Sequence, residues 1–78
     1  MQYVYILKTS LSTYYTGCTQ DLDARLERHN QGCVEYTKDK LPVEIIFYCA
    51  FIDKHKAFVF EQYLKSGSGA AFRNKHFI

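Results

Sequence analysis

Residues 14–32 decide the fold of this chain, and they read YYTGCTQDLDARLERHNQG. The aromatic residues at the start favour a strand that gives way to a helix after the first glycine. Either Thr19 or Asp21 can cap this helix, because a short polar side chain accepts a hydrogen bond from a free amide. Gly32 predicts its end, since glycine adopts the left-handed conformation at low cost. The stretch therefore predicts a strand, a sharp turn and a helix at about residues 21–30.

The predicted helix carries polar residues on the face that packing would bury. On a period of 3.6 residues, Leu22 and Leu26 share one face with Arg25 and His29. The two leucines must pack on the core, so they hold the guanidinium and the imidazole at its edge. Packing alone rarely favours a guanidinium there, and the pattern therefore indicates a functional site.

Length and composition predict one small domain over residues 1–78. The chain has 78 residues, of which 47% are hydrophobic and 17% aromatic, enough to fold around a core. The net charge of +2 is weak evidence for a nucleic-acid partner. The distribution is more informative, because the segment from Lys65 to the end contains basic residues and no acid.

Cysteine usage and hydropathy favour a cytoplasmic protein. Cys18, Cys33 and Cys49 are odd in number and form no closely spaced pairs, which predicts reduced thiols rather than a zinc site. No apolar run approaches the ~20 residues that cross a bilayer, and no signal peptide is recognisable. We therefore expect no membrane partner.

The remaining patterns predict two more strands and a second helix. Residues 3–7 and 13–18 alternate as the arms of a hairpin, and residues 43–51 form a third strand with two apolar faces. A helix at about residues 54–65 follows. The order strand, strand, helix, strand, helix predicts an α+β fold, with a small three-stranded antiparallel sheet flanked by helices.

The segment Ser66-Gly67-Ser68-Gly69 allows two interpretations. It is either a flexible connector, or a pair of glycines whose backbone amides can approach a phosphate. Residues 70–76 beyond it could form one or two further helical turns.

Three polar residues stand where packing favours carbon, namely Arg25, His29 and Glu61. A structural interpretation joins Arg25 to Glu61 in an ion pair between helices and bonds His29 to a backbone carbonyl. A functional interpretation places all three on the rim of a cleft. Tyr5 and Tyr15 are likewise either core aromatics or members of that site.

At these residues the chain resembles the GIY-YIG nuclease family, and in particular its small stand-alone bacterial members that are predicted endonucleases. Tyr3-Val4-Tyr5 corresponds to the first family motif and Tyr15-Thr16-Gly17 to the second. Arg25 stands eight residues after that glycine, and His29 lies one helical turn further on. Glu61 matches the metal-binding glutamate of the second helix. The ordered set covers nearly the whole chain and is more specific than any single motif.

The resemblance implies a divalent-metal-dependent endonuclease that hydrolyses phosphodiester bonds in DNA. Glu61 would bind Mg²⁺ or Mn²⁺, and Arg25 would hold the scissile phosphate. Tyr5 would act as general base or position the water, which requires its pKa of about 10 to be lowered by nearby cations. Tyr15 would orient the water or the phosphate. His29 would assist proton transfer or hold Arg25.

Five cations outside this set would contact the nucleic-acid backbone without reading bases. They are Lys38, Lys40, Lys65, Arg73 and Lys75. The DNA substrate would then be sequence-nonspecific or structure-specific. Asn74 is the plausible match for the family's C-terminal asparagine. Two alternatives stay open: a non-catalytic nucleic-acid-binding module that retains the nuclease fold, and a small interaction protein that uses the same cleft for a partner.

Overall fold

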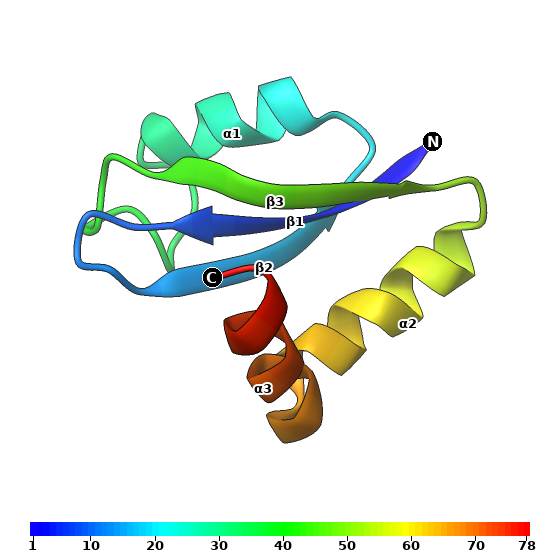
Figure 1. The fold of residues 1–78 in the computed structure, drawn as a ribbon. Helices are drawn as coiled ribbons and strands as arrows, with labels where there is room; N and C mark the ends of the chain where they lie inside the picture. Colours follow the sequence, from blue (N-terminus) through cyan, green and yellow to red (C-terminus); the bar gives the residue numbers. More distant parts are fainter.

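A computed structural model describes residues 1–78 as three strands and three helices (Figure 1). The strands are β1 (Gln2–Lys8), β2 (Tyr14–Thr19) and β3 (Glu44–Phe51), and the helices are α1 (Leu22–Asn30), α2 (Lys54–Lys65) and α3 (Gly67–His76). The sheet is antiparallel with the order β2-β1-β3, which makes β1 the central strand. The α+β fold is confirmed, and each predicted strand and helix lies within one residue of its expected bounds.

Helices cover both faces of the sheet, with α1 on one face and α2 and α3 on the other (Figure 1). On the α1 face, Tyr5 and Leu7 of β1 pack with the two leucines of α1. On the opposite face, Val4 and Ile6 pack with Leu64 of α2. The central strand therefore serves two small cores, which explains why both of its faces are apolar.

Strand β3 does not alternate regularly along its length. Phe47 pairs with Ile6, whereas Ile45 pairs with Leu7, and the register shift leaves Ile46 in a bulge. Ile45 packs on the α1 face and Phe47 on the other face. In a regularly alternating strand Ile45 and Phe47 would share a face; they do not, because the bulge adds one residue between them.

The ends of α1 follow the sequence prediction. Asp21 is the capping residue, since its side chain accepts a hydrogen bond from the Ala24 amide at 3.1 Å. Thr19 acts one step earlier, where its hydroxyl accepts from the Asp21 amide at 3.2 Å. Gly32 follows the helix with a φ of +78°, the left-handed conformation that favours glycine. These contacts fix the helix that carries Arg25.

The segment 66–69 is the start of α3 rather than a flexible connector. The Ser66 hydroxyl caps this helix by accepting a hydrogen bond from the Gly69 amide at 3.1 Å. A Cβ at Gly69 would collide with the carbonyl oxygen of Tyr63 in α2. Glycine therefore allows α3 to pack closely on the end of α2. The Gly69 amide, which the alternative interpretation offered to a phosphate, is used by the cap.

We expect Gly69→Ala to lower the free energy of unfolding by about 1–3 kcal/mol, because the methyl group must displace the backbone of α2. Gly67→Ala is the matched control, since nothing lies within 4 Å of a Cβ there. Alanine is more favourable than glycine in a helix by up to about 1 kcal/mol. Urea unfolding monitored by circular dichroism measures both variants. Equal unfolding midpoints would contradict the close packing of α3 on α2.

Candidate active site

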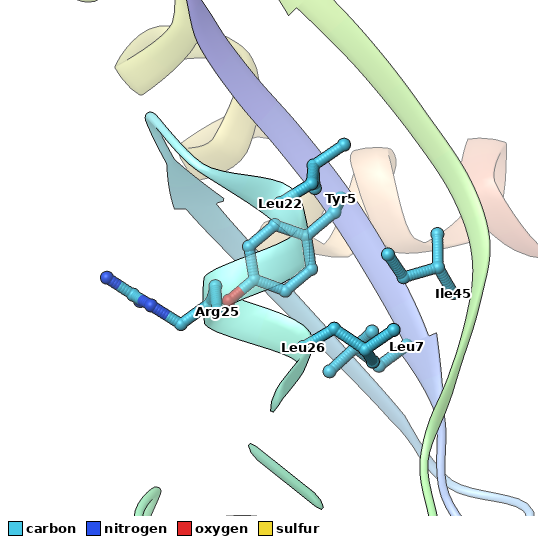
Figure 2. Close-up of a pocket in the computed structure, with 6 residues that line it drawn as sticks. All are labelled: Tyr5, Leu7, Leu22, Arg25, Leu26 and Ile45. Atoms are coloured by element: carbon cyan, nitrogen blue, oxygen red, sulfur yellow. The ribbon is translucent and has the colours of Figure 1, made fainter. Parts of the chain in front are cut away.

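Strand pairing determines where the Tyr5 hydroxyl lies. Tyr5 of β1 pairs directly with Gly17 of β2, and a Cβ at Gly17 would collide with the tyrosine ring and hydroxyl. Glycine thus provides the space into which the ring of Tyr5 extends. Figure 2 shows the ring among the apolar side chains of β1, α1 and β3, with its oxygen beside Arg25. The side chain is 1% exposed, so the hydroxyl is held in one place.

Four rings from four parts of the chain form an aromatic cluster at this hydroxyl. The His29 ring lies edge-on to both tyrosines, with centroid separations of 6.0 Å to Tyr5 and 5.1 Å to Tyr15. Tyr15 also packs against Tyr36, from the loop after α1, at 5.4 Å. Packing on both sides therefore fixes the orientation of Tyr15. We call these four residues the aromatic cluster.

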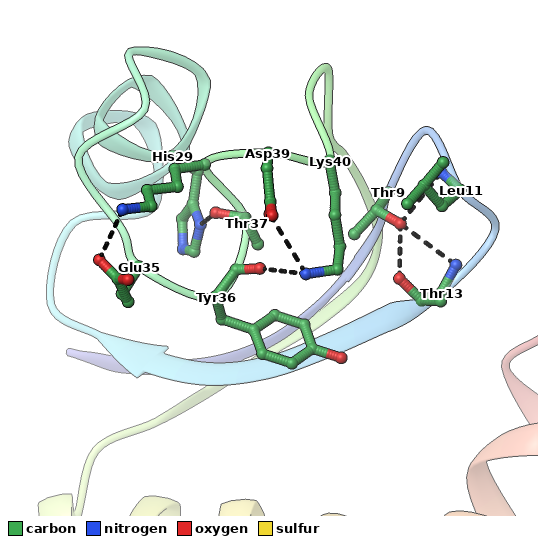
Figure 3. Close-up of polar contacts among 10 residues, drawn as sticks. Thr9, Leu11, Thr13, His29, Glu35, Tyr36, Thr37, Asp39 and Lys40 are labelled. Atoms are coloured by element: carbon green, nitrogen blue, oxygen red, sulfur yellow. Dashed lines mark hydrogen bonds and ion pairs between the residues drawn. The ribbon is translucent and has the colours of Figure 1, made fainter.

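His29 is fully buried and makes two side-chain hydrogen bonds. One joins its Nε2 to the Tyr5 hydroxyl at 3.2 Å, and the other joins its Nδ1 to the Thr37 hydroxyl at 2.7 Å (Figure 3). The prediction of a backbone carbonyl partner is wrong, because the hydroxyls of Tyr5 and Thr37 bond both ring nitrogens. Neither of these bonds goes to Arg25, so the imidazole holds Tyr5 rather than the guanidinium.

Burial shifts the pKa values of Tyr5 and His29 in opposite directions. It raises the pKa of Tyr5 to about 12, and the neighbouring Tyr15 and Glu61 raise it too, whereas Arg25 lowers it. Burial also lowers the pKa of His29, and the positive charge of Arg25 lowers it further. At neutral pH both groups are therefore uncharged. Arg25 alone does not bring the Tyr5 pKa below its ordinary value, because desolvation outweighs the single guanidinium.

Glu61 lies on α2, which covers the sheet face opposite α1, and its charge raises the pKa of Tyr5. Its side chain is 13% exposed and forms an ion pair with Lys65 one turn later, at 3.0 Å. No ion pair joins it to Arg25; the predicted pair between helices is wrong, because a lysine on the same helix is closer. Both charges nonetheless act on the pKa of Tyr5. The structure thus brings Tyr5, Tyr15 and His29 into contact, with Arg25 beside the Tyr5 oxygen, whereas Glu61 is linked to them only through the effect of its charge on the Tyr5 pKa.

Comparison with known proteins identifies the family. Residues 1–75 match the profile described as the GIY-YIG catalytic domain. The chain belongs to the GIY-YIG family. It is 41% identical over 66 residues to the UPF0213 protein CPE1444 of Clostridium perfringens, a match that covers 83% of this chain and 71% of that protein. Its identity to the UPF0213 protein YazA of Bacillus subtilis is 39% over 64 residues, covering 81% and 65% respectively.

A solved structure agrees with this assignment. The solution NMR structure of the UPF0213 protein BH0048 from Bacillus halodurans aligns with a TM-score of 0.59 and 32% identity, covering 96% of this chain and 84% of that one. Membership of the GIY-YIG family implies a nuclease-type function. None of the helices in this GIY-YIG chain has the length and apolar character that crossing a membrane requires.

Nucleases of the GIY-YIG family generally depend on a divalent metal ion, and Glu61 is the residue here that could hold one. No group of three or more His, Cys, Asp or Glu side chains gathers as a metal site. Mg²⁺ is commonly held by one or two carboxylates, with water and substrate phosphate filling the other positions. A single, mostly buried carboxylate fits such an ion, and it does not fit a metal enclosed by protein ligands.

Two of the five candidate backbone-binding cations line one groove of this GIY-YIG chain. Lys65 and Arg73 border a groove of about 320 Å³ together with Tyr14, Tyr15 and Tyr36. The Arg73 guanidinium lies 5.5 Å from the centre of the Tyr14 ring, within the range of a cation–π interaction. Positive charge and aromatic faces therefore meet next to the aromatic cluster.

The other three candidate cations lie outside this groove. Lys38 pairs with Glu35 at 3.1 Å, and Lys40 pairs with Asp39 at 3.4 Å (Figure 3). The hydrogen bond from Lys40 is the main cause of a lowered pKa at Asp39. Lys75 is exposed on α3. The Lys38 pair is exposed and therefore weak, whereas Lys40 is 24% exposed and also donates to the Tyr36 carbonyl at 2.8 Å.

The sequence did not single out Thr37, which the structure places fully buried against His29. It lies in the irregular loop between α1 and β3, where no periodicity marks a buried position. The available signal was indirect: a buried imidazole needs a partner for its second nitrogen. That requirement does not say which residue supplies the partner.

Proposed function

We propose that residues 1–78 form a single nuclease domain, a divalent-metal-dependent endonuclease that hydrolyses phosphodiester bonds in DNA. The supporting observation is a buried Tyr5 hydroxyl bonded to His29, with Tyr15 and Arg25 beside it and the charge of Glu61 acting on its pKa, in a chain of the GIY-YIG family. These residues come from β1, β2, α1 and α2. The stability of the fold alone does not require that combination.

Each side chain has a distinct role in the proposed reaction. Glu61 would hold Mg²⁺ or Mn²⁺, which when bound supplies positive charge at the scissile phosphate and acidifies water. Arg25 grips the phosphate, since its planar guanidinium forms two parallel hydrogen bonds to a phosphate group. Tyr15, fixed between His29 and Tyr36, orients the phosphate or the attacking water through its hydroxyl.

Tyr5 positions the attacking water, and in its phenolate form it accepts the proton of that water. In the free chain its pKa is about 12, so Tyr5 is protonated at neutral pH and must first lose its own proton to solvent. The positive charge of a bound metal ion would act with Arg25 to lower this pKa, because nearby cations favour the charged form of a tyrosine. His29 holds the oxygen of Tyr5 in position through the 3.2 Å hydrogen bond.

The DNA backbone follows the outer edge of β2 in this proposal. Arg25 and Lys54 line a groove of about 370 Å³ at one end of that strand. Lys65 and Arg73 line the groove at its other end. Lys38, Lys40 and Lys75 lie outside both grooves and would contact more distant phosphates. Such contacts discriminate by substrate structure rather than by base sequence.

Cleavage of labelled substrates tests the proposal directly. Linear duplex, branched duplex, single-stranded DNA and RNA are incubated with Mg²⁺, Mn²⁺ or a chelator, and nicked products are resolved on a denaturing gel. We expect cleavage with either metal and none with the chelator. The raised pKa of Tyr5 favours the alternative of a binding module. Binding without cleavage in every substrate and metal would establish that alternative.

The affinity for DNA should depend only moderately on salt. Few free cations are available outside the cleft, so we expect the logarithm of the affinity to fall against the logarithm of salt with a slope of about −2 to −4. Fluorescence anisotropy from low to moderate salt measures it. Lys75→Ala should reduce the magnitude of the slope by about one. Duplexes of unrelated base sequence should bind the unmodified chain with equal affinity. Salt-independent binding would contradict a backbone-led interaction.

A further inference from the structure

The loop between α1 and β3 presents one hydroxyl to the buried imidazole of the site. Thr37 is 0% exposed, and its hydroxyl lies 2.7 Å from His29 Nδ1. The loop is fixed around it, since the Thr37 amide donates to the Val34 carbonyl at 3.1 Å and its carbonyl accepts from the Lys40 amide at 2.9 Å. Lys40 also donates to the Tyr36 carbonyl at 2.8 Å (Figure 3). Thr37 is therefore held in place by its own loop.

The direction of the Thr37–His29 hydrogen bond decides which ring nitrogen carries the proton. A neutral imidazole donates from one nitrogen and accepts at the other. If Nδ1 donates to Thr37, then Nε2 accepts the hydroxyl proton of Tyr5. If Thr37 donates to Nδ1, then Nε2 carries the proton and donates it to the Tyr5 oxygen.

The surroundings of the two hydroxyls favour the second arrangement. The Thr37 hydroxyl makes a side-chain hydrogen bond to His29 and to no other group. If it accepted from Nδ1, its own proton would point into the interior without an acceptor, which is costly for a buried group. The Tyr5 hydroxyl instead lies beside Arg25 at the candidate site (Figure 2), where water or phosphate can accept its proton.

We propose that Thr37 is a positioning residue that donates to His29 Nδ1 and so places the imidazole proton on Nε2, facing the oxygen of Tyr5. His29 then acts on Tyr5 as a hydrogen-bond donor. A donor to the oxygen stabilises the deprotonated tyrosine, which forms when the hydroxyl proton passes to solvent and whose oxygen can then accept the proton of the attacking water. This inference rests on the proposed function for its catalytic consequence, but the position of the proton is a property of the free chain.

The position of the proton is measured by ¹⁵N NMR on the labelled chain at pH 7.5. The chain has three histidines, of which His55 and His76 are exposed and serve as internal references. We expect His29 to carry its proton on Nε2 in the unmodified chain. In Thr37→Val, which keeps the shape and removes the donor, the population with Nε2 protonated should fall clearly. Thr37→Ser should restore it, because serine supplies the same donor.

Cleavage gives a second readout with the same variants. Thr37→Val should lower kcat on the order of 10-fold with KM unchanged, and shift the pH profile to higher pH by about one unit, since one pKa unit is a tenfold change in the deprotonated fraction. Thr37→Ser should restore both values. Ser68→Ala, which removes an exposed hydroxyl on α3, should leave the NMR signals of His29 and the pH profile unchanged.

Two results would overturn the inference. One is an unmodified chain in which His29 carries its proton on Nδ1. The other is a folded Thr37→Val variant with the Nε2 population of the unmodified chain. A chain that cleaves nothing, yet shows the expected NMR response, would refute the proposed nuclease function and leave the role of Thr37 intact.

Discussion

Replacing Glu61 with glutamine is expected to abolish metal-dependent cleavage while leaving DNA binding nearly unchanged. Glutamine keeps the shape of the side chain but removes the charge that holds a hard dication. The loss of the metal should lower kcat on the order of 1000-fold or more. The fold should tolerate the change, because the partner Lys65 is 46% exposed and regains water. Nicking of labelled DNA and isothermal titration with Mn²⁺ measure the two properties separately.

A matched control for this variant is Glu27→Gln on the exposed face of α1. Glu27 accepts a hydrogen bond from the Gln31 side chain at 3.1 Å and lies away from the site. It should cleave at the unmodified rate and bind Mn²⁺ with unmodified affinity. A folded Glu61→Gln chain that cuts at the unmodified rate would end the proposed mechanism.

Replacing Arg25 with alanine should damage both cleavage and binding. In the proposed reaction the guanidinium would contact the phosphate before and during cleavage, so we expect a loss of about 100–1000-fold in cleavage and a several-fold loss in affinity. The lost charge also removes the one protein group that lowers the pKa of Tyr5. Stability should change little, since Glu61 pairs with Lys65 and is not left alone.

Two variants separate the causes of the Arg25 defect. Arg25→Lys keeps the charge without the planar fork, so it should recover affinity better than it recovers cleavage. Arg28→Ala removes an exposed arginine from the next turn of the same helix and should resemble the unmodified chain. Thermal unfolding confirms that each variant is folded. Equal losses in Arg25→Ala and Arg28→Ala would show that only net charge matters.

The fold was predictable because the hydrophobic periodicity of each helix and strand, together with its capping or turn residues, can be read from the local sequence. The change from a period of 2 to a period of 3.6 after Gly17 and again at Asp53 marks both transitions from strand to helix. Two features were missed for the same reason. The bulge at Ile46 and the close approach at Gly69 depend on neighbouring elements, and no local pattern encodes that geometry.

The candidate site was predictable as a set of residues but not as a set of contacts. The helical face of α1 identifies Arg25 and His29 as polar groups at the edge of the core. The partner of Glu61 was wrongly assigned. Helical periodicity gives the face on which a side chain lies, but not its distance from a residue on another helix. The pKa of Tyr5 could not be predicted either. Its largest cause is burial of the hydroxyl, and that burial follows from the pairing of Tyr5 with Gly17 across two strands.

The pairing of Tyr5 with Gly17 makes the length of a surface turn part of the reaction chemistry. A slip of one residue between β1 and β2 would place Thr16 or Cys18 opposite Tyr5, and both carry the Cβ for which there is no room. The turn at residues 9–13 sets that alignment. Inserting or deleting one residue there would therefore disable the hydroxyl without altering any side chain that handles the substrate. In the proposed reaction, a turn remote from the candidate phosphate site thus determines how deep the Tyr5 oxygen lies.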